Sequence, residues 1–281
     1  MICADWGYAY LASTNGSGKS VSLGDYYGMK ESFVKNGTLA TTKTKWTTRK
    51  EEDNPAMAYV HNLGSVSNSG KEGFMMLGYD DIYSIEYMYE KRMGYWKHDG
   101  KVTIFDAFEK LRDNHQAIME RCRAFDELIY DDAEKAGGKK YAEICSASYR
   151  QVISAHKLFT DKEGNLLWFS KENNSNGCVN TVDLTYPSAP LFLVYNPELQ
   201  KAMMTSIFEY SASGRWNKPF PAHDLGTYPI ANGQVYGGDM PIEEGGNMVI
   251  LAAAISKIEG NADYVKKFVI SILSNRYSGD C

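Results

Sequence analysis

The pattern of the sequence changes at Thr103, and this change constrains the fold more than any other feature. Before it, short runs rich in aromatic or β-branched residues are separated by turn residues, as at Asn15-Gly16 and Asn36-Gly37. Such runs predict β-strands, and several of them at this spacing predict part of an antiparallel β-sandwich. The predicted strands are 5–12, 37–46, 56–61, 73–78 and 82–87.

After Thr103 the apolar residues recur at three- or four-residue steps, which predicts helices. Thr103 followed by Asp106 has the form of a capping box, and the helix that starts there is predicted to end at about Lys135. Gly137-Gly138 ends it, and residues 141–153 predict a second helix, so that the two form an antiparallel hairpin. Further helices are predicted at 189–213 with a break at Asn196-Pro197, at 244–258 and at 263–275, and a short β-hairpin around 161–165.

The chain therefore divides into two predicted domains. A β domain is predicted at 1–104 and a helical domain at 105–281. A chain of 281 residues is long enough to bury the cores of two moderate domains.

Charge and cysteine usage exclude several classes of function. The net charge is −5 and the lysines and arginines are scattered, so nucleic acid is not an expected partner. No apolar run approaches the roughly 18 to 20 residues of a membrane helix, and the first residues lack the pattern of a signal peptide. The cysteines form no CxxC motif and no short spacing with histidine, so we expect no zinc site, and their odd, sparse set argues against a disulfide framework. No motif in the sequence requires a metal or an organic cofactor. The cysteines are Cys3, Cys122, Cys145, Cys178 and Cys281.

Gly18-Lys19-Ser20 resembles the end of a phosphate-binding loop. The full motif needs glycine where Ser13 stands and a helix after the lysine, and residues 21–28 do not predict one. We therefore interpret the segment as a hairpin turn.

The segment 219–248 is rich in glycine, proline and carboxylates but poor in periodic apolar residues, which predicts a long ordered loop at the rim of an active site. Asp224 is a candidate general acid, base or substrate anchor, or alternatively a residue that caps a turn. Glu243 and Glu244 are further catalytic candidates, of which one is expected in the site, although first-turn glutamates also suit a plain helix start. His223 can shuttle a proton or make a structural hydrogen bond, and Tyr228 can line a pocket.

A second polar loop, 170–183, supplies candidate substrate-binding residues, namely Lys171, Glu172, Asn173 and Asp183. A cation beside carboxylates and amides can hold an amino acid or the hydroxyls of a sugar. The alternative is a solvated loop with internal turns. Cys178 is interpreted as a packed thiol rather than a nucleophile, and His156 as a packing histidine on a helix.

These two loops resemble the signature blocks of the glutaminase A family of fungi and bacteria. The blocks are 171–192, 195–199, 218–229 and 238–248, while 5–8 and 78–83 resemble the preceding β domain of that family. The resemblance implies a β-sandwich followed by an (α/α)6 toroid of the six-hairpin glycosidase type. It also implies hydrolysis of L-glutamine to glutamate and ammonia, and a secreted or periplasmic location.

Family members are longer than this chain, which starts within the β domain and ends after about five helices, so a fragment is expected. The expected function is hydrolysis of a small-molecule amide, with the oligomeric state left open. Two alternatives remain. One is a glycoside hydrolase that uses paired carboxylates on the same toroid, and the other is an inactive truncated or binding fragment.

Overall fold

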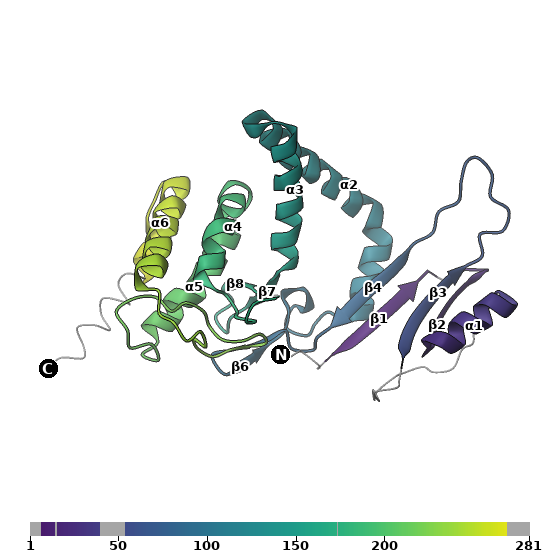
Figure 1. Cartoon of the computed structure of the whole chain (residues 1–281), viewed down its shortest axis with the longest axis horizontal. Coiled ribbons are helices and arrows are strands. Elements are labelled where there is room, and N and C mark those ends of the chain that lie inside the picture. Colours follow the sequence, from purple (N-terminus) through teal and green to yellow (C-terminus); the bar gives the residue numbers. More distant parts are fainter. Residues whose placement is uncertain (1–6, 15, 40–53, 173, 269–281) are drawn as a thin grey trace. The chain divides into compact units, whose positions relative to one another are not determined.

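The computed structural model describes residues 7–14, 16–39, 54–172 and 174–268 (Figure 1). They pack as two compact units. The N-terminal unit contains 7–80 and 103–115, and the helical unit contains 81–102 and the chain from residue 116 onward. The predicted boundary after residue 104 coincides with the start of a helix, whereas packing places 81–102 with the later helices. The domain boundary itself stays a prediction.

Two antiparallel strand pairs form the N-terminal unit. Strand β1 (Tyr8–Ser13) pairs with β4 (Met75–Asp80), and β2 (Lys19–Asp25) pairs with β3 (Pro55–His61). Among the described residues of this unit, these pairs form separate two-stranded sheets, so that the expected sandwich is not confirmed.

Two elements of this unit were missed by the sequence analysis. One is β2, and the other is helix α1 (Tyr26–Asn36), which begins where Asp25 accepts a hydrogen bond from the Gly28 N–H and ends at Gly37 with φ 67°. The side chain of Asp25 thus satisfies one of the free N–H groups of the first turn. The predicted strand 37–46 lies mostly outside the described residues, and its described part, 37–39, is not a strand.

The phosphate-loop resemblance is excluded because Lys19 begins a strand instead of a helix. The interpretation as a hairpin turn is also wrong in one respect. The turn joins β1 to β2, but each of these strands pairs with a different partner.

Helix α2 (Ile104–Gly137) follows the predicted pattern. The capping box at its start is confirmed, because Thr103 N–H donates to Asp106 Oδ2 at 2.8 Å and Asp106 N–H donates to Thr103 Oγ1 at 3.2 Å. Helix α3 (Lys139–Ser154) follows after Gly138, and Phe125 of α2 packs edge-on against Tyr149 of α3 with ring centroids 5.2 Å apart.

The predicted β-hairpin is also confirmed. Strand β7 (His156–Thr160) pairs with β8 (Leu166–Ser170), and Asp161 holds the turn by accepting from Asn165 N–H at 2.8 Å. His156 begins β7 rather than lying on a helix, and its ring stacks on Trp168 with centroids 5.0 Å apart. Its interpretation as a packing residue agrees with this position.

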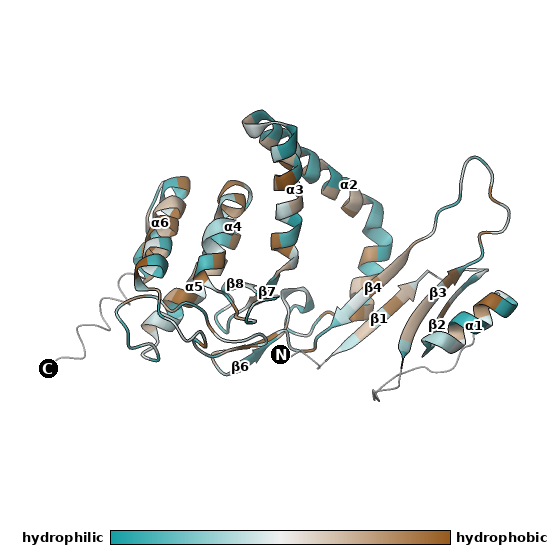
Figure 2. Cartoon of the chain, in the orientation of Figure 1, coloured by the Kyte–Doolittle hydropathy of each residue, from teal (hydrophilic) through white to brown (hydrophobic). Residues whose placement is uncertain are grey.

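The helical unit also contains α4 (Val182–Tyr195), α5 (Pro197–Ala212) and α6 (Pro241–Glu259). Residues 263–268 are helical as well, in agreement with the described part of the helix predicted at 263–275. The break between α4 and α5 falls at Asn196-Pro197 as predicted, and Asn196 caps α5. Helices α4 and α6 are more hydrophobic than α2, in keeping with their packing against each other and against α5 (Figure 2). The predicted loop 219–248 is irregular only up to Met240, because its last residues are the first turns of α6.

Short strands join residues 81–102 to the helical unit. Strand β5 (Ile85–Tyr87) pairs with β6 (Glu90–Arg92) on one side and in parallel with β9 (Ile230–Ala231) on the other, and a 3-10 turn follows at Tyr95–Lys97. The pairing with β9 explains why residues 81–102 pack with the helical unit.

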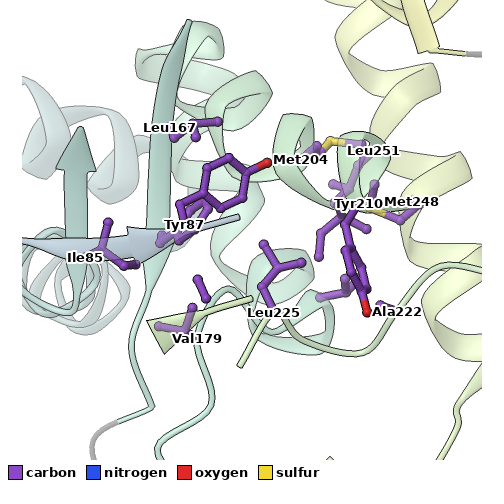
Figure 3. Packing of buried hydrophobic residues seen from close by; sticks show 14 of the residues in the cluster. Ile85, Tyr87, Leu167, Val179, Met204, Tyr210, Ala222, Leu225, Met248 and Leu251 are labelled. Carbon is purple, nitrogen blue, oxygen red and sulfur yellow. The ribbon is translucent and has the colours of Figure 1, made fainter. Parts of the chain in front are cut away.

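The core of this unit gathers side chains from β5, β8, α5, α6 and the loops between them (Figure 3). Phe159 and Phe169 lie at its centre, fully buried, with edge-to-face rings 4.7 Å apart. Burial of each such side chain contributes roughly 1.5–3 kcal/mol. In the described part of the chain, no helix combines the length and apolar character needed to cross a membrane.

Candidate functional site

The two polar loops of the sequence lie side by side. Val179 N–H donates to Gly226 O at 2.8 Å, Leu225 N–H donates to Val179 O at 2.9 Å, and Val182 N–H donates to His223 O at 2.9 Å. Gly226 has a φ of 143°, and a Cβ at this position would lie 2.1 Å from the carbonyl oxygen of Ile230. Only glycine fits there, because the backbone of the loop folds back on itself at this point.

This arrangement brings together Asp183, His223 and Glu244. One potential ligand atom from each lies within 4.8 Å of the others, and His223 Nε2 is 3.9 Å from Asp183 Oδ2. Asp183 lies in the first turn of α4 and Glu244 in the first turn of α6, where the helix dipole favours a negative charge. The side chain of Asp183 is 32 % exposed, whereas His223 and Glu244 are 3 % and 0 % exposed. The cluster is thus buried with one accessible side.

His223 is held in a fixed orientation. Its Nδ1 lies 3.1 Å from Asp224 Oδ2, its backbone N–H donates to Gln234 Oε1 at 2.8 Å, and its ring stacks on Tyr236 with centroids 4.2 Å apart. With Nδ1 next to the Asp224 carboxylate, Nε2 is the ring nitrogen on the side of Asp183.

Asp224 itself is completely buried by the loop that follows it. Its Oδ1 accepts from the N–H groups of Gly226 at 2.8 Å and Val235 at 3.0 Å, and its Oδ2 accepts from Tyr236 N–H at 3.1 Å. This geometry agrees with the alternative of a turn-holding residue. Asp224 acts on the cluster through His223.

The two adjacent glutamates are placed differently. Glu243 is exposed on α6, whereas Glu244 is buried and, among the described residues, neither of its carboxylate oxygens has a hydrogen-bond partner. Burial, together with smaller effects of the nearby charges of Asp183, Glu243 and Asp224, raises the pKa of Glu244 to about 8. Asp183 Oδ1 is also buried without a partner in the described part of the chain.

The other predicted binding residues form separate contacts. Lys171 Nζ lies 5.1 Å from the centroid of the Tyr228 ring, and burial together with Lys157 lowers the pKa of Lys171, against the effect of Asp81. Glu172 accepts a hydrogen bond from Thr181 Oγ1 at 2.9 Å. These contacts do not join the three-residue cluster, and Asn173 lies outside the described residues.

Cys178 has the environment of a packed thiol. It is 1 % exposed, and burial raises the pKa of its thiol to about 12, with further contributions led by Asp224. A thiol with so high a pKa is a poor nucleophile.

Gln234, which accepts from the backbone N–H of His223, was not among the predicted site residues. A lone glutamine in a glycine-rich loop carries no local signal of such a role. The sequence analysis also missed a cavity of about 470 Å³ in the helical unit, lined among others by Tyr87, Glu209 and Arg215. Asp183, His223 and Glu244 do not line this cavity. We place the candidate chemistry at the cluster, because among the described residues it is there that unpartnered buried carboxylate oxygens lie next to an oriented imidazole.

Comparisons with known proteins bear on the same segments. Residues 138–275 match the family model of the glutaminase A six helical-hairpin domain, and residues 2–132 match a domain of unknown function, DUF5127. Glutaminase A of Aspergillus oryzae (strain ATCC 42149 / RIB 40) is 34 % identical over 272 residues, which cover 94 % of this chain and 39 % of the relative. The chain belongs to the glutaminase A family. A probable glutaminase of Arthroderma benhamiae (strain ATCC MYA-4681 / CBS 112371) is 25 % identical over 270 residues, or 90 % of this chain and 30 % of the relative.

This member of the glutaminase A family thus spans well under half of the length of either curated relative. Both relatives carry the name glutaminase. The cluster lies within the part matched by the six helical-hairpin model.

Proposed function

We propose that this chain supplies the hydrolytic site of a glutaminase-type enzyme, which converts the side-chain amide of L-glutamine to glutamate and ammonia. The observation that carries the proposal is the convergence of Asp183, His223 and Glu244 in the helical-hairpin domain of the glutaminase A family.

Hydrolysis of an amide needs a group that takes a proton from water and a group that returns one to the departing nitrogen. A C–O bond forms from water to the amide carbon, the C–N bond breaks, and ammonia leaves with the returned proton. Asp183 is best placed to exchange protons with bound water, because its side chain is 32 % exposed while the other two groups are buried. In this proposal Asp224 is a positioning residue that fixes the ring of His223.

Lys171, Glu172 and Tyr228 are proposed to bind the amino acid end of the substrate. Lys171 suits the α-carboxylate and Glu172 suits the α-amino group, since each offers the opposite charge. The partly buried Lys171 ammonium beside the Tyr228 ring is less hydrated than one in open water, which strengthens its pairing with an anion.

One observation favours the second candidate, a retaining glycoside hydrolase. Oxygens of Asp183 and Glu244 approach within 4.8 Å, close to the roughly 5–5.5 Å between the two carboxyl groups of such enzymes. The family name favours glutamine, and substrate tests separate the two reactions.

The decisive experiment measures ammonia release from L-glutamine and phenol release from aryl glycosides by the purified chain. We expect ammonia release, and we expect Asp183→Asn to lower kcat/KM by at least about 100-fold, the usual effect of losing an acid–base group. Glu243→Gln removes the same charge from an exposed position and should change kcat/KM less than about 2-fold. Glycoside hydrolysis without ammonia release would establish the second candidate, and full activity in Asp183→Asn would remove the cluster from the mechanism.

Two broader expectations from the family remain part of the proposal. Helices α2 to α6 are proposed to be hairpins of an α/α toroid that follows a β-sandwich domain, and the enzyme is proposed to be secreted or periplasmic.

A further inference from the structure

The cluster contains more buried, unsatisfied acceptor atoms than a folded protein ordinarily tolerates. Among the described residues, both oxygens of Glu244 and Oδ1 of Asp183 are buried without a hydrogen-bond partner. His223 Nε2 belongs to the same cluster and lies 3.9 Å from Asp183 Oδ2, while its Nδ1 lies 3.1 Å from Asp224 Oδ2. These oxygen and nitrogen atoms are of the kinds that ligate a divalent cation.

The spacing of these acceptors suits a cation. A tetrahedral metal ion with ligands at about 2.0–2.1 Å holds ligand atoms roughly 3.4 Å apart. The three potential ligand atoms already lie within 4.8 Å of one another, and Nε2 of His223 is 3.9 Å from Oδ2 of Asp183. Small side-chain movements close the remaining gap, and the exposed side of Asp183 provides a path of entry.

The surroundings of His223 match those of a metal ligand. Metal-binding histidines ordinarily donate their second ring N–H to a carboxylate or carbonyl, which fixes the tautomer and raises the basicity of the ligating nitrogen. Asp224 Oδ2 lies 3.1 Å from His223 Nδ1, in the position of such an acceptor, and three backbone N–H groups donate to Asp224 in turn.

We propose that Asp183, His223 and Glu244 bind one divalent cation of the zinc class, with Asp224 as the outer residue that orients His223. The imidazole favours zinc over calcium, magnesium and manganese, which prefer oxygen ligands. The earlier expectation of no metal came from the absence of short cysteine and histidine spacings, whereas these ligands come from three separate segments.

The role of the ion in catalysis rests on the proposed function. Three protein ligands leave a fourth position for water, and a bound zinc ion lowers the pKa of that water toward neutrality. The proposal that the three residues bind a cation does not depend on this catalytic role, because metal binding is measured in the absence of substrate.

The test is calorimetric titration of the chelator-treated chain with ZnCl₂ and MnCl₂, with CaCl₂ in parallel. We expect one site per chain for zinc. Glu244→Gln and Asp183→Asn should each weaken it at least about 100-fold, and Asp224→Asn should weaken it about 10- to 100-fold. Glu243→Gln removes the same charge at the neighbouring, exposed position. Its affinity for zinc should lie within about 2-fold of that of the parent chain.

Circular dichroism of each variant checks folding, and the part-exposed Asp183 provides a second variant should Glu244→Gln fail to fold. Absence of zinc binding to the parent chain overturns the proposal, as does equal binding by Asp183→Asn and Glu243→Gln. Zinc binding without ammonia release from glutamine supports the metal site and rejects the proposed function. Ammonia release by a chain that binds no metal supports the proposed function and rejects the metal site.

Discussion

Adjacent residues of this chain have opposite environments, and Glu243 and Glu244 show it most clearly. Both begin α6, but successive residues of a helix are about 100° apart around its axis, so that only one can face the core. Glu244 takes the inner face and meets His223, whereas Glu243 faces solvent. At this scale the residue types were predictable, but the choice between two neighbours was not.

His156 provides a prediction about pH at the same scale. The pKa of His156 is lowered from its ordinary 6.5 to about 4, mainly because the ring is buried. The hydrogen bond to Val152 O raises this pKa, and the nearby charge of Lys171 lowers it. As pH falls below 6.5 the unfolded chain takes up a proton that the folded chain does not, so stability is present above pH 6.5 and is lost as pH falls toward 4. His156 alone should lower the free energy of unfolding by about 3 kcal/mol once the pH has fallen to about 4.

Urea unfolding at several pH values between 7.5 and 4.5 measures this effect. His156→Phe keeps an aromatic ring against Trp168 but cannot titrate, so its free energy of unfolding should depend less steeply on pH than that of the parent. Parallel curves for the two proteins would contradict the assignment.

Individual elements were predictable where their ends carry local signals. The start of α2 at Thr103, the break at Asn196-Pro197 and the turn at Asp161 all depend on bonds within a few residues, and all were predicted. Helix α1 was missed although Asp25 caps it, because its apolar residues are mostly exposed and give no clear period. The sandwich was not confirmed because strand pairing is a long-range choice, which the strand sequences alone leave open.

The start of α2 provides a prediction at this scale. Thr103→Ala removes an oxygen that accepts from Asp106 N–H and donates to Asp106 Oδ2, which should lower the free energy of unfolding by about 1 kcal/mol. Asp113→Ala, which removes an exposed pairing with Arg112 on the same helix, should change it by less than about 0.5 kcal/mol. Chemical denaturation measures both, and equal effects of the two substitutions would mean that the capping box does not stabilise α2.

At the scale of the whole molecule, the site depends on segments that are distant in sequence. Backbone hydrogen bonds from residues 177–182 to residues 223–228 hold the two loops together, and the packing of α4 against α6 brings their first turns into one place. The core beneath them adds β5 and β8 to the same unit.

Gly226 provides the prediction at this scale. Gly226→Ala should lower the free energy of unfolding by more than about 2 kcal/mol, because a Cβ there would meet the backbone of Ile230 and the φ of 143° disfavours alanine. Gly237→Ala lies in the same loop with nothing within 4 Å of its Cβ, so that its effect should be small. Thermal unfolding compares the two variants, and a Gly226→Ala protein as stable as Gly237→Ala would contradict the loop geometry.

The sequence by itself determined the helices and turns whose signals are local, and the types of residue available for chemistry. Periodicity, capping and turn formation act over a few residues, so they can be read without the fold. Only the tertiary structure decided that Asp183, His223 and Glu244 meet while Glu243, Lys171 and Glu172 lie apart from them. That outcome depends on which helix faces pack together and on which loop carbonyls and amides form hydrogen bonds. These contacts join segments that are distant in sequence, and sequence separation does not predict distance in space.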